Sequence, residues 1–235
     1  MRNVKYLDIS EQIEKMYVDQ AHEKKLPKEM ELANQFNVSR ETIRKALNQL
    51  ITSGKLYSIQ GSGYYVKKDG ISIVNPLNKL SSVTEMIQNA CLVEGDMDTK
   101  IYLGHPTEME REQLDLNEGD EVYFIERIRT AKGEPVVYSK NLLPFKLVGE
   151  SFQEYYHQGS LSRFLEVFYK IEITEALAEV QAISSGEFLP EVFVEMDIHV
   201  LKFTQLHRTI KGEPVLLSYD YMRNDTIRFF IQRQK

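Results

Sequence analysis

Apolar residues near the start of the chain recur at helical spacing. Ile9, Ile13, Met16 and Tyr17 lie at i, i+4, i+7 and i+8, which places them on one stripe of a helix. The pattern predicts a first helix over residues 9–20 with one buried face.

Two further helices are predicted before residue 53. Pro27 suits the first turn of a short helix over residues 28–36. Ser39 then caps a helix over residues 40–52, because its hydroxyl can accept a hydrogen bond from a free amide of the first turn. This third helix has a charged outer face and an apolar inner face, which consists of Ile43, Ala46, Leu47, Leu50 and Ile51.

A glycine-tipped hairpin follows the third helix. Gly54 suits a left-handed helix cap, and the short strands at residues 56–59 and 64–66 are joined by the four residues QGSG. Three helices followed by such a hairpin predict a winged helix-turn-helix, whose third helix enters the major groove of DNA.

The second half of the chain contains an internal repeat. Residues 129–136 read RTAKGEPV and residues 208–215 read RTIKGEPV. In each copy a Lys-Gly turn lies between two strand patterns, which predicts two hairpins. The first pairs residues 122–129 with 136–143, and the second pairs residues 200–209 with 215–222.

Other patterns complete this half. Residues 71–77 form an extended connection, helices start after Ser82 and Thr107, and residues 161–168 form another helix. Further strands are expected at residues 171–182 and 229–232. The prediction is an α+β protein whose second domain is an antiparallel sheet with helices on one face.

The charge is distributed unevenly along the chain. The net charge is −6, but residues 1–68 hold 12 Lys and Arg against 8 Asp and Glu, a local charge of +4. A basic N-terminal domain suits a polyanionic partner. The single Cys91 and the absence of a signal peptide or a long apolar run favour a cytoplasmic protein without a membrane span.

The N-terminal motif resembles that of a known family. The run LPKEMELANQFNVSRETIRKALNQLITSGKLYSIQGSGYYV is similar to the DNA-binding domain of GntR-type regulators. Met30 departs from this pattern, because many relatives have an arginine there, and this puts one DNA contact in doubt. With the outer face of the third helix, the resemblance implies DNA contacts from Lys28, Ser39, Arg40, Thr42, Arg44, Lys45, Gly61, Ser62 and Gly63. A merely solvated basic face, or a winged helix used for protein contacts, is the alternative.

The remainder, from about residue 76 to 233, resembles the UTRA domain of the HutC branch of these regulators, which has a chorismate-lyase-like fold. The resemblance rests on ER-x-R, GEPV, a GSL helix start and a C-terminal RNDxxRF. It implies a site for an anionic or phosphorylated effector made of Ser82, Thr84, Arg127, Arg129 and Ser160, to which Glu179 is added as a candidate.

Arg127 and Arg129 share one strand face by the period of two, so both guanidinium groups can reach one anion. The alternative for Arg127 is a salt bridge with a neighbouring carboxylate. Leu216 and Met222 replace polar residues of many relatives, which predicts a ligand less polar than an amino sugar.

An enzyme is disfavoured by the residue patterns. The five histidines show no metal-ligand spacing, and there is no nucleophile elbow or phosphate-binding loop, so we expect no metal, cofactor or catalytic residue. A ligand-independent DNA binder and a lyase-like enzyme fused to a winged helix are the alternatives to an effector-controlled transcription repressor.

The expected organisation is a DNA-binding domain at residues 1–70, a linker at 71–77 and an effector-binding and dimerisation domain at 78–235. We expect a homodimer that binds an inverted-repeat DNA operator, because two-fold symmetry in the protein implies it in the site.

Overall fold

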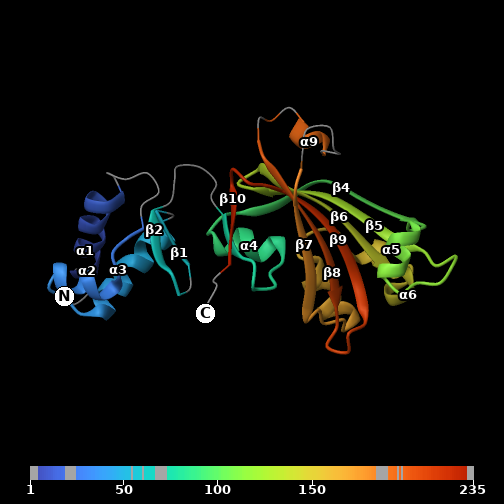
Figure 1. Ribbon diagram of the computed structural model, residues 1–235, viewed down its shortest axis with the longest axis horizontal. Coiled ribbons are helices and arrows are strands. Elements are labelled where there is room, and N and C mark those ends of the chain that lie inside the picture. The colour runs from blue at the N-terminus through green and yellow to red at the C-terminus, as the bar shows by residue number, and fades with distance from the viewer. Residues whose placement is uncertain are drawn as a thin grey trace. The chain divides into compact units, whose positions relative to one another are not determined.

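A computed structural model describes residues 5–18, 25–53, 55–59, 61–66, 73–183, 190–194, 196 and 198–231. The chain divides into two compact units, residues 1–78 with 229–235 and residues 79–228 (Figure 1). Among the described residues, no helix is both long and apolar enough to cross a membrane.

The first unit begins with three helices and a hairpin. Its elements are α1 (Lys5–Ile13), the π-helix η1 (Glu14–Val18), α2 (Glu29–Gln35), α3 (Arg40–Thr52), β1 (Leu56–Ile59) and β2 (Gly63–Val66). β1 and β2 pair antiparallel, with Leu56 opposite Val66. Side chains of all three helices and both strands share one apolar core, as expected for a winged helix-turn-helix.

The predicted bounds are confirmed for the third helix, and the observed bounds of the first two helices differ from the prediction. α3 spans residues 40–52 and starts at Ser39, whose hydroxyl accepts from the amide of Thr42 at 3.2 Å. The first helix already begins at Lys5 and continues as a π-helix after Ile13, so Met16 is 46% exposed instead of lying on a buried stripe. Gly54 lies outside the described residues.

The strand predicted at residues 229–232 was placed wrongly. The structure has β10 (Ile227–Phe230), which pairs with β3 (Ile73–Pro76) in a separate two-stranded sheet. The predicted extended connection thus contains a strand. A short apolar stretch does not indicate which strand it pairs with. For this reason the sequence analysis placed this strand in the large sheet.

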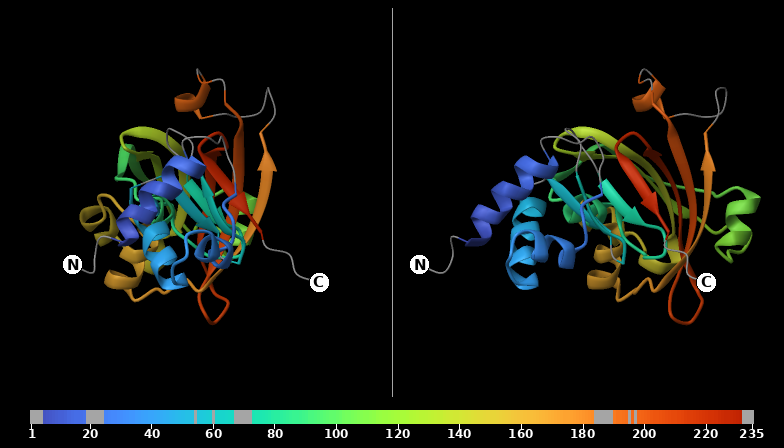
Figure 2. Two further views of the ribbon diagram at one scale, coloured as in Figure 1. Left: turned by 90° about the vertical axis from the view of Figure 1, so that its left-hand side faces the viewer. Right: turned by 60° about the vertical axis from the view of Figure 1, so that its left-hand side comes forward.

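The second unit is built on a six-stranded antiparallel sheet in the order β4-β5-β6-β9-β8-β7, which is curved (Figure 2). Its strands are β4 (Glu94–Gly104), β5 (Val122–Ala131), β6 (Glu134–Pro144), β7 (Glu175–Ala182), β8 (Val200–Arg208) and β9 (Pro214–Arg223). The edge strand β4 was not predicted. Its burial does not alternate and its register shifts between Met97 and Lys100, so it lacks the period-two signal of a half-buried strand.

The two GEPV repeats form the two predicted hairpins, but with different turns. In the first, Lys132 (φ 51°) and Gly133 (φ 81°) form a two-residue connection between Ala131 and Glu134. In the second, the amide of Thr209 donates to the carbonyl of Glu213, which leaves a three-residue loop. The same local sequence therefore closes two hairpins of different length.

Helices pack on both faces of the large sheet. They are α4 (Val83–Asn89), α5 (Glu108–Gln113), α6 (Phe145–Val148), α7 (Ser151–Tyr155), α8 (Leu161–Phe164), the π-helix η2 (Leu165–Tyr169) and α9 (Glu191–Val194). One core joins α6, α7, α8 and η2 to the face that carries Ile125 and Leu143. A second core joins Phe193 of α9 and Leu114, the C-cap of α5, to the opposite face. The polar cavity described below lies on the first of these faces.

Candidate functional site

The outer face of α3 presents two arginines that are fixed by one carboxylate. The side chains of Arg40 and Arg44 are 55% and 60% exposed. Arg40 Nη2 donates to Glu29 Oε2 at 2.9 Å, and Arg44 Nε donates to Glu29 Oε1 at 2.9 Å. Each guanidinium therefore keeps donors free while its orientation is restrained.

Glu29 connects three elements of this face. Its side chain is 15% exposed and also accepts a hydrogen bond from the hydroxyl of Tyr64 on β2, at 3.0 Å. The hydrogen bonds from Arg44, Arg40 and Tyr64 outweigh desolvation and lower the pKa of Glu29 to about 2. Sequence reasoning missed this role, although the position of Glu29 directly after Leu26-Pro27-Lys28, at the start of the GntR-like run, was the available signal.

The other residues predicted for DNA contact near these arginines are exposed, except Thr42, which is half-buried. Lys28 is the N-cap residue of α2, and its amide donates to Glu31 Oε2 at 3.0 Å. Thr42 lies beside the helix cap, and Lys45 forms an exposed ion pair with Glu41 at 2.9 Å. Met30 is 60% exposed.

The tip of the hairpin has the backbone that its glycines were expected to provide. Gly61 and Gly63 adopt φ angles of 75° and 124°, which residues with a Cβ atom rarely adopt. The hydroxyls of Ser62 and Tyr65 lie 2.7 Å apart. The nine predicted DNA-contact residues therefore lie at the N-cap of α2, at the N-cap and on the outer face of α3, and at the hairpin tip.

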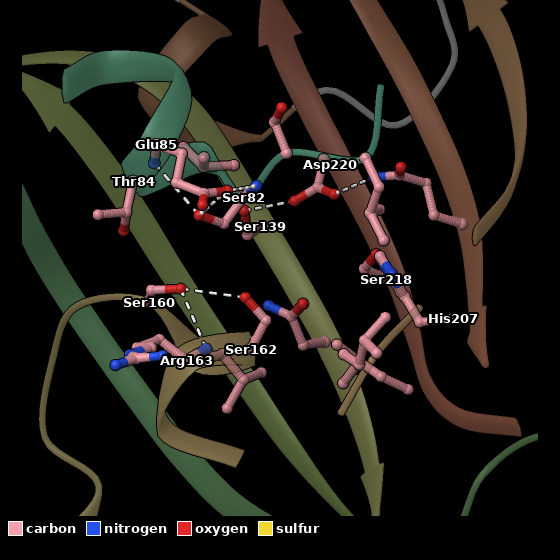
Figure 3. A pocket seen from close by; sticks show the side chains of 18 of the residues that line it. Ser82, Thr84, Glu85, Ser139, Ser160, Ser162, Arg163, His207, Ser218 and Asp220 are labelled. Atoms are coloured by element: carbon pink, nitrogen blue, oxygen red, sulfur yellow. Dashed lines mark hydrogen bonds between the residues drawn. The ribbon is translucent and has the colours of Figure 1, made fainter. Parts of the chain in front are cut away.

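A cavity of about 510 Å³ lies on the face of the large sheet that α8 covers (Figure 3). Its walls come from the N-terminal ends of α4 and α8 and from strands β5, β6, β8 and β9. Of the six predicted effector residues, five line it: Ser82, Thr84, Arg127, Arg129 and Ser160. Glu179 does not. It is exposed on the edge strand β7, where it accepts a hydrogen bond from Gln181, and its role stays a prediction.

Arg129 is held by two carboxylates of the neighbouring edge strand. The residue is 1% exposed; Nη1 lies 2.8 Å from Asp96 and Nη2 donates to Glu94. Nη2 also donates to the Thr84 hydroxyl at 2.7 Å, and Nη1 to the Gly159 carbonyl at 3.0 Å. Because Asp96 lies opposite Arg129 in the β4–β5 register, the unpredicted strand supplies the counter-charge.

Arg127 is less strongly paired. Its Nη1 donates to the Gly159 carbonyl at 2.6 Å and to the Tyr156 hydroxyl, and lies 3.8 Å from Asp96. The Nε atoms of both arginines are buried without a hydrogen-bond partner among the described residues. The salt bridge that was the alternative for Arg127 is therefore present, as a long ion pair with Asp96.

Two helix N-termini complete this side of the cavity. Ser82 forms a capping box with Glu85, whose amide donates to the serine hydroxyl at 3.2 Å. Ser160 caps α8 by accepting from the amide of Arg163 at 3.3 Å, and its hydroxyl lies 3.1 Å from that of Ser162. The hydroxyl groups and the guanidinium donors therefore lie on the same side of the cavity.

The opposite wall is polar, and its residues were not identified from the sequence. Asp220 is 5% exposed, accepts from the hydroxyl of Ser139 at Oδ1 and from Gln205 Nε2 at Oδ2, and burial raises its pKa. His207 Nε2 lies 2.8 Å from the Ser218 hydroxyl, and burial lowers its pKa to about 4, so the ring is neutral near pH 7. Figure 3 shows Asp220, Ser218 and His207 on the strands facing Ser160 and Thr84.

The cavity lining combines polar and apolar side chains. Among the described residues, no group of three or more His, Cys, Asp or Glu side chains is arranged to hold a metal ion. The cavity has charged and hydroxyl groups beside the apolar side chains of Leu216 and Met222.

The sequence and the fold both match characterised groups of proteins. The model of bacterial regulatory proteins of the gntR family matches residues 5–66, and the UTRA domain model matches residues 99–228.

Individual relatives agree with these matches. The HTH-type transcriptional repressor NagR of Bacillus subtilis (strain 168) is 30% identical over 203 residues, which is 86% of this chain and 76% of the relative. The HTH-type transcriptional regulator TreR of the same organism is 31% identical over 178 residues, 75% of this chain and 73% of the relative. The crystal structure of PhnF from Mycobacterium smegmatis shares the fold, with a TM-score of 0.64 at 21% identity over 96% of this chain and 99% of that chain.

Proposed function

This chain belongs to the gntR family of bacterial regulatory proteins and carries a UTRA domain, and we propose that it is a cytoplasmic repressor controlled by a small polar metabolite. It is a transcription regulator and not an enzyme. The proposed parts are a DNA-binding domain at residues 1–70, a linker at 71–77 and an effector-binding and dimerisation domain at 78–235.

The proposed DNA contacts centre on α3. Arg40 and Arg44 are exposed one turn apart, and Glu29 restrains both, so less side-chain freedom is lost when they meet bases or phosphates. The N-terminal end of α3 and the glycine-rich hairpin tip supply the remaining contacts. A homodimer would present two such faces to an inverted repeat.

The proposed effector site is the cavity of the second unit. The observation that carries this assignment is that Arg127 and Arg129 line the cavity together with the hydroxyl residues Ser82, Thr84 and Ser160. Two guanidinium groups beside hydroxyl groups can donate several hydrogen bonds to one anionic group, so a bound anion is the natural ligand of this side of the cavity. Hydroxyls from Ser160 and Ser162 lie on the same side.

Effector binding is proposed to change operator affinity by favouring one arrangement of the two DNA-binding domains over another. A coupling free energy of about 1–3 kcal/mol suffices to change that affinity from several-fold to about a hundredfold. Release from the operator on effector binding would make the protein a ligand-relieved repressor.

Selection of binding sites from random duplex DNA tests the DNA-binding part of this proposal. The full chain is expected to enrich an inverted repeat, and light scattering of the complex is expected to give two chains per duplex. Enrichment of no sequence, or of an asymmetric half-site bound by one chain, would contradict the proposed dimeric repressor.

A further inference from the structure

The polar wall opposite the arginines contains a buried carboxylate, Asp220, which Arg127 attracts only from a distance and which forms no ion pair among the described residues. Both oxygens of Asp220 accept hydrogen bonds from neutral groups, the Ser139 hydroxyl and the Gln205 amide. Among the described residues, no Lys or Arg side chain forms an ion pair with Asp220, whereas Arg127 and Arg129 are paired with carboxylates of β4. A buried carboxylate is costly unless a charge compensates it.

Strand register places this carboxylate at a defined separation from the arginines. Arg127 lies opposite Ser139 in the β5–β6 ladder, and Ser139 lies opposite Asp220 in the β6–β9 ladder. Neighbouring strands are about 4.8 Å apart, so the backbones of Arg127 and Asp220 are separated by roughly 10 Å. Both side chains line the same cavity, so one small ligand can span them.

The buried charges beside the cavity do not balance. Arg127 and Arg129 are paired with Glu94 and Asp96 of β4, which leaves Asp220 as a third buried or half-buried carboxylate. The other charged residues of the lining are exposed: Glu85, Arg163, Glu166 and Glu172. A ligand with only an anionic group would bring no positive charge next to Asp220, which has only the distant attraction of Arg127. A ligand that also carries a protonated amine supplies the missing positive charge.

The second hydrogen-bonding group on this wall suits the same ligand. His207 Nδ1 is buried and has no partner among the described residues, while Nε2 is engaged with Ser218. If Nε2 carries the proton and donates it to the serine oxygen, Nδ1 is a free acceptor. Asp220 and His207 then form an acceptor-rich end of the cavity, opposite the donor-rich end at the arginines.

We propose that the effector is a zwitterion whose anionic group binds at Arg127 and Arg129 and whose protonated amine binds at Asp220, with His207 accepting a further hydrogen bond. This assignment rests on the proposed effector role of the cavity. It departs from the expectation of a less polar ligand, which was based on Leu216 and Met222; both line the cavity, but beside polar groups.

Two matched series of compounds test the amine site by calorimetric titration of the full chain. The probes are ω-aminoalkyl phosphates with two to six carbons and the ω-hydroxyalkyl phosphates of the same lengths. At one chain length or more, the amine is expected to bind about tenfold or more tightly than its hydroxyl counterpart, because a charge-assisted hydrogen bond replaces a neutral one. Asp220→Asn is expected to abolish this preference and to retain binding of the hydroxyalkyl phosphate.

Control variants distinguish the effect of the Asp220 charge on ligand preference from effects of misfolding and of the protein's net charge. Glu175→Gln on the exposed strand β7 removes one negative charge outside the cavity and is expected to leave the preference unchanged. Asp220→Ala, which cannot place an amide nitrogen against Gln205, should also lose the preference. Thermal melting shows that each variant is folded.

Equal affinities for both series, no binding of either, or a preference that persists in both Asp220 variants would overturn the amine site. The proposed regulator function is judged separately, by whether operator affinity responds to any metabolite. A response to a purely anionic or uncharged compound, without amine preference, would retain the regulator and refute the zwitterion.

Discussion

Replacing Arg129 with alanine removes the centre of a buried ion-pair network and should destabilise the second unit strongly. Arg129 is 1% exposed, and Asp96, 2.8 Å from its Nη1, has a side chain that is 6% exposed. After the replacement, Asp96 would keep the Gly159 amide, 3.1 Å away, and Arg127 at 3.8 Å.

The expected loss follows from leaving a buried carboxylate poorly compensated. Breaking a buried pair by removing one partner costs about 3–5 kcal/mol. For a unit of this size, each kcal/mol lowers the melting temperature by roughly 2–4 °C, so the transition of the second unit should fall by roughly 6–20 °C.

Urea denaturation of Arg129→Ala, Asp96→Asn and the double variant measures this coupling. In the Asp96→Asn background, only the half-buried Glu94 carboxylate loses its partner, so Arg129→Ala should cost less by about 0.5–3 kcal/mol. A loss below about 1 kcal/mol for the single variant, or costs that add without coupling, would refute the claim that β4 provides the counter-charge.

Further predictions concern the two candidate sites. Arg44→Ala should weaken operator binding by about 1–3 kcal/mol and lower the melting temperature only slightly, because Arg40 and Tyr64 still hold Glu29, whereas Lys5→Ala on α1 should change neither; unchanged affinity would remove Arg44 from the interface. Glu29→Gln should lower the ratio of operator to non-specific affinity, because both arginines lose their restraint; an unchanged ratio in filter binding would argue against that role. Since the pKa of Glu29 is lowered from 4.5 to about 2, its stabilising effect is complete above pH 4.5 and is lost as the pH falls towards 2, so this variant should show a shallower decline of unfolding free energy over that interval. Arg127→Lys keeps a charge near Asp96 but loses the planar donor fork, so effector response should weaken while the fold and operator binding persist; an undiminished response would exclude Arg127 from the effector site.

The elements with strong local signals were predictable from sequence. The apolar spacing and serine cap of α3, and the turn glycines of both GEPV hairpins, each fix a structure within a few residues. Two capping boxes, after Ser82 and Thr107, also start helices as predicted. Interactions in these segments are between neighbours in sequence, so they can be inferred from spacing alone.

Long-range pairing accounts for what was missed. β4 carries no alternating pattern, and the strand at the C-terminal end pairs with residues about 150 positions earlier in the chain. Consequently the counter-charges of Arg129 were missed. Asp220 and His207 were also unrecognised, because only the β8–β9 and β6–β9 registers bring them to the cavity that Arg127 lines.

The central claim is that occupancy of the cavity controls binding to DNA. Its most direct test is the dissociation constant of the full chain for its selected operator, measured with and without a compound that raises the melting temperature of the wild-type protein but not of an Asp220→Asn, Arg127→Lys variant. The account predicts a change between several-fold and about a hundredfold for the wild type and none for the variant. A compound that occupies the cavity and leaves the operator affinity unchanged would contradict it.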